Sequence, residues 1–330
     1  SDITNSVIHS YRIRNDKAGG NESLIITIVN NYISIGAELY IESIQKIYDA
    51  IRDTTTGTRL VKVTENYIDT NLNGSLDKND LIDYITYTHW DRVRNVKGEM
   101  VSAQVIESIV VIDNTRFTET LKYVYKEKKD NNTLYTVTEI YEGRFDISGG
   151  SVLTGVQKQY VKIESGNNFI TRVIEIYAPE LLDTPISTQY ITKSIEQKDG
   201  KDAILTTIKT FEYGLNDAIS VEKIWYEARN GKLVTHITTY EMSILVSEKL
   251  IWKQVENING ASRLVTYTEI YEFGLKEATA LQKAYKTIEE GRLVTIIQNY
   301  ELFLSSTEAV TTQKIYYDRA KVADGTPRLV

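Results

Sequence analysis

Residues 230–235 read NGKLVT, and the same phrase returns as GASRLVT at residues 260–266 and as GRLVT at residues 291–295. Each copy leads into an aromatic–glutamate pair, and successive pairs are 29, 31 and 29 residues apart (240 − 211, 271 − 240 and 300 − 271). A period of about thirty residues is typical of a stacked array, in which one supersecondary unit is added to the next. The four pairs are Phe211-Glu212, Tyr240-Glu241, Tyr271-Glu272 and Tyr300-Glu301.

Each unit has the sequence of a β-hairpin. Asn-Gly and Asp-Gly pairs, which stand at 230–231, 259–260 and 199–200, mark hairpins because both central residues of a type I′ turn need a positive φ. The composition agrees, since tyrosine is abundant at 23 residues while proline, which cannot donate to a strand ladder, occurs only 3 times. Residues 37–51 could also be drawn as an amphipathic helix, but equivalent positions of a repeat should share a structure. We therefore predict a strand there.

Toward the N-terminus the pattern loosens and the spacing widens, with outgoing strands ending near Tyr177, Tyr141, Tyr67 and Tyr32. The sequence predicts an all-β fold, an antiparallel meander of roughly nine β-hairpin repeats with a period of about 30–35 residues. The sheet would be extended or loosely wound into a solenoid-like array. Residues 1–165 would form its irregular half, which contains one inserted loop, and residues 166–330 its more regular half.

Neither face of these strands is convincingly apolar. On the incoming strands Lys223 and Trp225 recur in step with Lys283 and Tyr285. Side by side, they predict lysine and aromatic ladders, in which each cross-strand pair contributes about 0.2–1 kcal/mol. Two interpretations stay open: a sheet with one thinly covered face, or a largely single-layer or loosely wound sheet with much of both faces exposed to solvent.

The clearest chemical motif is residues 69–80, DTNLNGSLDKND, which match the spacing of a twelve-residue calcium loop with glycine at the sharp sixth position. Calcium needs six to eight hard oxygen ligands, and this spacing wraps them round one point. The alternative is an Asp/Asn-rich turn without a metal, because such residues also favour turns. The predicted Ca²⁺ ligands are Asp69, Asn71, Asn73, Ser75 (through its backbone carbonyl), Asp77 and Asp80.

Two resemblances attach to these residues. With Asp80 at position twelve and Leu81-Ile82 after it, the loop resembles those of dockerins and of extracellular EF-hand-like modules. This resemblance implies a structural calcium site, an extracellular setting and millimolar calcium. The phrases Trp225-Tyr226-Glu227 and 231–235 resemble the repeats of YD-repeat proteins, which implies a hairpin-built β-shell. The period here is longer, and glutamate replaces that family's aspartate.

The sequence does not predict an enzyme. His9, His89 and His236 are scattered, and each is most simply a residue of a strand surface. No phosphate loop, nucleophile elbow or zinc spacing occurs. Glutamates such as Glu139 and Glu269 recur with the repeat, which we interpret as a solvated face.

Charge and composition limit the partners. The net charge of −7 argues against nucleic acid as a partner. No apolar run reaches the roughly eighteen residues of a membrane helix, and strands such as 283–286 alternate badly for lipid, so we expect no membrane insertion. The absence of cysteine excludes disulfides and fits either the cytosol or an extracellular protein that needs none.

Both ends of the sequence fall inside a repeat. Residue 1 is Ser with no export segment before it, so we expect a removed signal or a piece of a longer chain. Residues 324–330 copy the phrase of residues 259–265. The two ends could pair within one molecule and close a ring, pair between copies head-to-tail or edge-to-edge, or continue in a longer fibre.

These features predict an extracellular or cell-surface structural protein that assembles with copies of itself into a filament, sheath or surface array. Calcium would stabilise it. The alternative is an adhesin or phage-type fibre module, whose long loops bind surface glycans.

Overall fold

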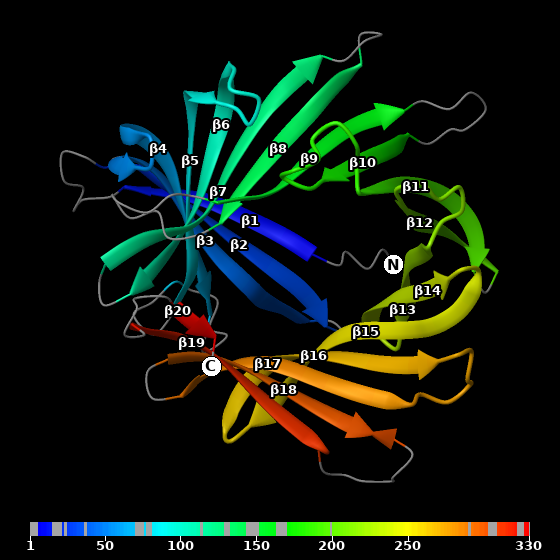
Figure 1. Cartoon of the computed structure of the whole chain (residues 1–330). Coiled ribbons are helices and arrows are strands. Elements are labelled where there is room, and N and C mark those ends of the chain that lie inside the picture. Colours follow the sequence, from blue (N-terminus) through cyan, green and yellow to red (C-terminus); the bar gives the residue numbers. More distant parts are fainter. Residues whose placement is uncertain are drawn as a thin grey trace.

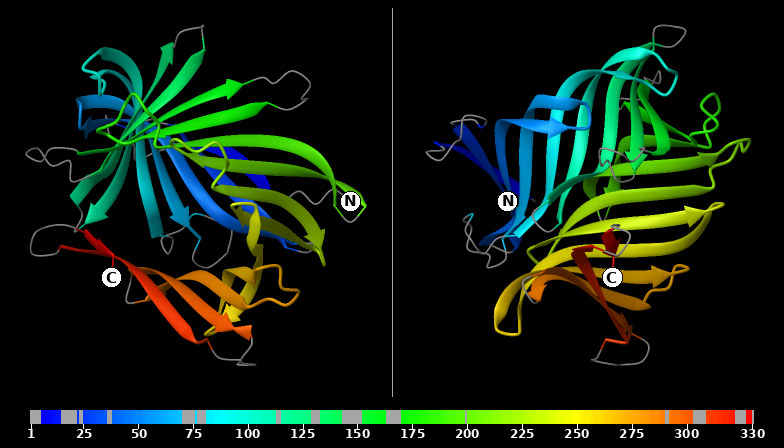
Figure 2. Two further views of the ribbon diagram at one scale, coloured as in Figure 1. Left: turned by 45° about the vertical axis from the view of Figure 1, so that its right-hand side comes forward. Right: turned by 60° about the vertical axis from the view of Figure 1, so that its left-hand side comes forward.

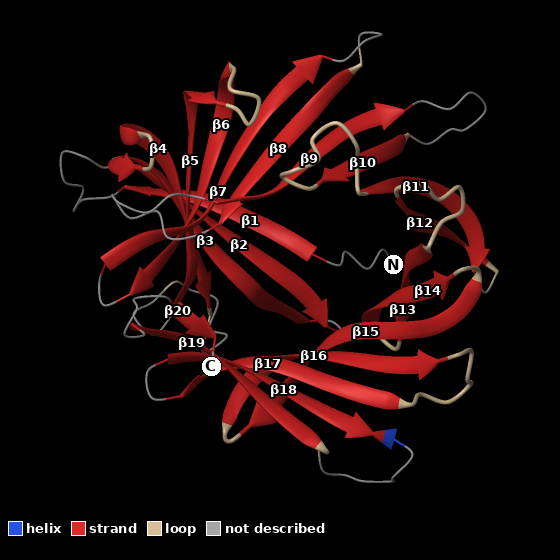
Figure 3. Ribbon diagram, viewed as in Figure 1, coloured by secondary structure: helices blue, strands red, loops and turns tan. Residues whose placement is uncertain are grey.

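The computed structural model describes residues 6–14, 22, 25–35, 38–69, 76, 81–112, 115–128, 133–142, 152–162, 170–198, 200–289, 292–302, 309–321 and 327–329. It confirms the predicted fold class, because the chain is a single antiparallel meander of β-strands with no closure of the sheet on itself (Figures 1 and 3). Within these residues no helix is long and apolar enough to cross a membrane.

The strands pair in chain order, so β1 to β18 form successive hairpins, as the repeat predicts. In each hairpin the odd-numbered strand is incoming and the even-numbered strand is outgoing. Of the segment at 37–51, which was open to a helical interpretation, residues 38–51 belong to strand β3, and residue 37 lies outside the described residues. The strands are β1 (Ser6–Arg14), β2 (Ile25–Ile35), β3 (Glu38–Thr54), β4 (Gly57–Ile68), β5 (Leu81–Arg94), β6 (Met100–Ile112), β7 (Thr115–Lys128), β8 (Leu134–Glu142), β9 (Val152–Lys162), β10 (Thr171–Tyr177), β11 (Ser187–Lys198), β12 (Lys201–Glu212), β13 (Ser220–Arg229), β14 (Lys232–Glu241), β15 (Ile244–Ile258), β16 (Ala261–Glu272), β17 (Ala280–Glu289), β18 (Arg292–Glu301), β19 (Thr311–Lys321) and β20 (Pro327–Leu329).

The hairpin tips have the turn geometry that their residues predict. Asn230 and Gly231 have φ values of 53° and 73°, and Asn259 and Gly260 have 53° and 80°. Both pairs therefore lie in the left-handed region that a type I′ turn requires. The right-handed twist of such turns matches the twist of the flanking strands, and this fixes the register of each hairpin.

At the end opposite the tips, the pairing between one hairpin and the next is broken at a recurring point. A register shift lies just before the aromatic position of the outgoing strand at Asn31/Tyr32, Asn66/Tyr67, Ile140/Tyr141 and Thr239/Tyr240, and before Ile109 in β6. A bulge bends its strand and increases the local twist. Repeated bulges therefore coil the single layer, and Figure 2 shows the strands following one another round this curve.

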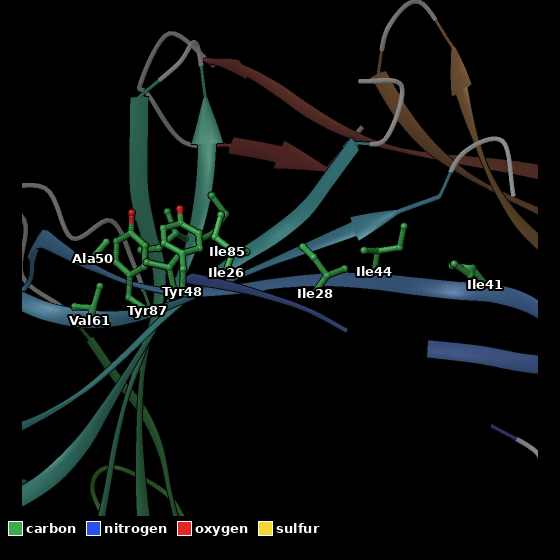
Figure 4. Packing of buried hydrophobic residues seen from close by; sticks show 11 residues of the cluster. Ile26, Ile28, Ile41, Ile44, Tyr48, Ala50, Val61, Ile85 and Tyr87 are labelled. Carbon is green, nitrogen blue, oxygen red and sulfur yellow. The ribbon is translucent and has the colours of Figure 1, made fainter. Parts of the chain in front are cut away.

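The coil gives the sheet a covered inner face and an exposed outer face. On β4, Val61 and Val63 on the inner face are fully buried, while Leu60 on the outer face is 69% exposed. The buried side chains form three apolar clusters along the sheet. In the cluster at the N-terminal end, Tyr48 and Tyr87 project to the same side of the strands as Ile28 (Figure 4). Where these clusters lie, one face of the sheet is covered, as in the first interpretation. The sheet is a single layer, as in the second, and no side chain of β11 or β13 is buried.

The coil also brings distant segments together. Strands β14 and β15 approach β2, and Lys253 of β15 forms an ion pair with Glu42 of β3, 211 residues away in sequence. Even so, β1 pairs only with β2 among the described strands, and the sheet stays open. The expectation that the ends might close a ring is therefore wrong for this structure.

Candidate functional sites on the inner face

Among the described residues, four glutamates of the inner face accept hydrogen bonds from tyrosine hydroxyls. Glu139 of β8 is 0% exposed and accepts from Tyr125 of β7 at 2.8 Å and from Tyr141, two residues along its own strand, at 2.7 Å. We call these arrangements the tyrosine–carboxylate clusters. The other three pair Glu65 with Tyr48 and Tyr67 (both 2.8 Å), Glu175 with Tyr160 (3.4 Å) and Tyr177 (2.6 Å), and Glu269 with Tyr271 (3.0 Å).

In the clusters of Glu65 and Glu139, hydrogen bonding and burial shift the pKa of individual groups. Burial by itself raises the pKa of Glu65, but hydrogen bonds from Tyr67, Tyr48 and the Lys46 ammonium outweigh it, so this pKa lies below its usual value. Burial, together with the adjacent carboxylate of Glu139, raises the pKa of the Tyr125 phenol far above its usual value. The Tyr125 phenol therefore stays a donor, and the Glu65 carboxylate an acceptor, across the whole neutral range.

The tip of one hairpin contacts the inner face of the next hairpin. Thr55, in the β3–β4 turn, donates to Glu107 of β6 through its backbone N–H at 3.0 Å and through its hydroxyl at 2.6 Å. In the same way, the N–H of Val96 in the next turn donates to Glu139 of β8 at 2.8 Å. We call these the hairpin-tip contacts. They show how a single layer covers part of its own inner face, because these two hairpins close over the hairpins that follow them.

Lysines take over this role in the C-terminal half. Lys232, beside the β13–β14 tip, donates to Gln254 of β15 at 2.6 Å and lies 6.0 Å from the Trp252 ring. Lys283 lies 5.0 Å from the ring of Tyr267 and 5.6 Å from that of Tyr300, which belong to the strands on either side. These contacts are cross-strand lysine–aromatic pairs and not the ladders that the sequence predicts, because an outgoing strand lies between successive incoming strands. Each desolvated pair stabilises the sheet by about 0.5–2 kcal/mol.

Two sequence interpretations of single residues are wrong. Glu139 was assigned to a solvated face, yet it is fully buried, since its hydrogen bonds compensate the cost of burying a charge. His89 and His236 were assigned to strand surfaces and are also buried, and only His9 is exposed. His89 lies 3.1 Å from the Thr56 hydroxyl of a hairpin tip, and burial lowers the pKa of its imidazole. These residues therefore belong to the packing of the inner face.

The inner face of β11 and β12 is hollowed by an open cavity of ≈ 610 Å³. Here Lys209 stands where the outgoing strands β4, β8, β10 and β16 carry the cluster glutamate, and Tyr190 lies directly opposite it on β11. Thr171, at the start of β10, is 1% exposed, and its hydroxyl has no hydrogen-bond partner. The complete lining is Lys162, Thr171, Pro185, Thr188, Tyr190, Thr192, Lys209, Phe211, Glu212, Tyr213, Gly214, Leu215 and Asn216.

The predicted calcium loop lies mostly outside the described residues. Of its six proposed ligands, Asn71, Asn73, Ser75, Asp77 and Asp80 are not described, so the structure does not test the site. Asp69, the first ligand position, is 4% exposed at the end of β4, and Leu76 packs against the N-terminal apolar cluster. Within the described part of the chain, no group of three His, Cys, Asp or Glu side chains is placed to hold a metal.

In the best-formed clusters the inner-face carboxylates accept from two or more donors. Burial raises the pKa of the cluster phenols of Tyr48, Tyr125, Tyr141, Tyr160, Tyr177 and Tyr271. The signal for the clusters was present in the sequence as glutamate two residues before tyrosine, at 65/67, 139/141, 175/177 and 269/271. Sequence reasoning missed it because the same alternation also fits a solvated strand face. Comparison of the chain with protein-family models, with curated proteins and with solved structures found no match.

Proposed function

We propose that this chain is a structural protein that assembles with copies of itself into a filament, sheath or surface array outside the cell. The observation that carries the proposal is the edge strand β1 of an open sheet. Among the described strands, β1 has β2 on one side and no neighbour on the other. An edge strand of nine residues offers a row of backbone donors and acceptors to another strand.

The side chains of β1 support this proposal. Ile8 on one face is 65% exposed, and Tyr11 and Ile13 on the other face are 46% and 42% exposed. Edge strands that stay single are usually protected by charge, proline or a bulge. The described part of β1 has no proline and no register shift, and its two arginines, Arg12 and Arg14, lie in the last three residues of the strand. Apolar side chains exposed on both faces are what a further strand would cover.

The hairpin-tip contacts suggest how one copy could continue the inner face of another. In the first hairpin, Asn30 occupies the position of the cluster glutamate and donates to the Tyr32 hydroxyl at 3.3 Å. Its own Oδ1 is buried and has no hydrogen-bond partner. In β6 and β8 the equivalent oxygen accepts an N–H from the preceding hairpin tip. A hairpin tip from a second copy would satisfy Asn30 in the same way.

Electron microscopy and light scattering of the purified chain in millimolar calcium test this proposal. We expect regular assemblies, which Tyr11→Lys should reduce because it places a charge at the edge. Tyr226→Lys is the matched control, since Tyr226 is comparably exposed on β13, inside the sheet and away from the edge. Uniform monomers of the unmodified chain, or equal behaviour of the two variants, would refute assembly through β1.

A further inference from the structure

We infer that the cavity over β11 and β12 is a binding site for an acidic sugar, that is, a pyranose carrying a carboxylate. The argument begins with the row of inner-face residues to which Lys209 belongs. Strand register places Tyr160, Val173, Tyr190 and Lys209 side by side across β9 to β12. The next row on the same face lies two residues further along each strand and consists of Lys158, Glu175, Thr188 and Phe211.

In this row a cation replaces the anion of the other repeats. Equivalent positions carry Glu65, Glu139, Glu175 and Glu269, each of which is bound by a tyrosine hydroxyl. Lys209 makes no ion pair within the described residues, and it remains solvent-accessible at the wall of an open cavity. An ammonium in such a place attracts a carboxylate, and the partial desolvation inside the cavity strengthens that attraction.

The hydroxyl groups of the cavity fit a polyhydroxylated ligand. Thr188 and Thr192 of β11 and Thr171 of β10 line the same wall. The Thr171 hydroxyl is buried without a partner, which costs about 1–3 kcal/mol unless something in the cavity bonds it. A sugar hydroxyl can donate and accept at once, so it can satisfy this group and its neighbours together.

The aromatic residues supply the apolar surface. Tyr190 and Phe211 pack edge-to-face with their ring centroids 5.4 Å apart, and both line the cavity. Binding pockets combine such apolar walls with a few convergent polar groups that fix orientation. A pyranose has an apolar C–H face as well as hydroxyl edges, whereas inorganic phosphate would leave the aromatic wall unused. The site does not depend on assembly of the chain into filaments.

Ligand-observed NMR with methyl glucuronide, and with methyl glucoside as the neutral probe, tests the inference. We expect saturation transfer from the protein to the glucuronide, and affinity at least tenfold weaker for the glucoside. Lys209→Glu should abolish binding of the glucuronide. It introduces the residue that β8 carries at this position, where Glu139 lies opposite Tyr123 as Lys209 lies opposite Tyr190, so the fold should tolerate it.

Lys193→Glu is the matched control. It makes the same charge change on neighbouring β11, but on the exposed outer face, and should leave binding unchanged. Lys209→Gln is a second variant that removes the charge without adding one, and it should weaken binding at least tenfold. Circular dichroism checks that each variant is folded. Absence of transfer to the glucuronide, equal binding of the neutral glucoside, or full binding by a folded Lys209→Gln would each overturn the inference.

Discussion

Replacing Glu139 by leucine should destabilise the protein by about 4 kcal/mol, although the change makes the residue more apolar. The Glu139 carboxylate is fully buried and accepts from Tyr125 at 2.8 Å, from Tyr141 at 2.7 Å and from the Val96 N–H at 2.8 Å. Each buried donor left without an acceptor costs about 1–3 kcal/mol. The loss of an acceptor for three donors gives the estimated destabilisation. Water can bond the half-buried Tyr141 hydroxyl and so reduces the cost at that donor.

Urea denaturation followed by far-UV circular dichroism measures this change as a lower midpoint with an unchanged slope. Glu142→Leu is the matched control, because Glu142 is exposed three residues further along the same strand. Surface substitutions usually change stability by less than about 0.5 kcal/mol. A comparably small effect of Glu139→Leu would contradict the reasoning.

A second comparison separates the hydrogen bonds from simple packing. When both partners of a buried hydrogen bond become apolar, the cost falls, because no donor is left unsatisfied. The triple variant Glu139→Leu, Tyr125→Phe, Tyr141→Phe should therefore be about 1–3 kcal/mol more stable than Glu139→Leu alone. If the triple variant were the less stable of the two, the tyrosine–carboxylate cluster would not be the source of the effect.

Three further predictions concern the pH dependence of stability, the β14–β15 turn and the calcium loop. The pKa of Glu65 is lowered and that of Tyr48 is raised. Stability from Glu65 is therefore present above the unfolded pKa of 4.5 and is lost as pH falls through the folded value. Stability from Tyr48 is present below pH 10.0 and is lost as pH rises above it. Urea midpoints measured against pH should thus fall at both ends, and a flat profile above pH 10.0 would contradict the assignment. In the β14–β15 turn Met242 and Ser243 have φ values of 46° and 69°, so Met242→Asn with Ser243→Gly should raise stability by about 1–2 kcal/mol, seen as a higher urea midpoint. Millimolar calcium should raise the melting temperature relative to chelator, and Asp69→Ala should abolish the shift; equal melting in calcium and chelator would leave residues 69–80 as an ordinary turn.

Much of the fold could be predicted from the sequence, because a β-hairpin is specified by residues that are close together in the chain. Asn230-Gly231 specifies its turn through two positive φ values, and flanking alternation specifies the strands. Repetition at equal spacing also settled 37–51 as a strand, which local pattern alone left open. The candidate calcium ligands rest on spacing within twelve residues, so they too are a local signal.

The tyrosine–carboxylate clusters and the cavity could not be predicted from the sequence in the same way. Glu139 and Glu142 are chemically identical in the sequence and three residues apart, yet one is buried and the other exposed. Three residues apart on one strand, they point to opposite faces. The tip of another hairpin, whose Val96 N–H lies 43 residues away in sequence, covers the face of Glu139. Lys209 likewise resembles any strand lysine until the register places it opposite Tyr190.

The sequence by itself determined the repeating unit, because turn geometry and strand alternation depend on neighbouring residues. Only the tertiary structure decided which face is buried. The bulges before Tyr32, Tyr67, Tyr141 and Tyr240 coil the sheet. The tips at Thr55 and Val96 lie over the next hairpin, where they donate to Glu107 and Glu139. Both faces carry mixed polar and apolar residues, so burial here depends on contacts between units that no single repeat contains.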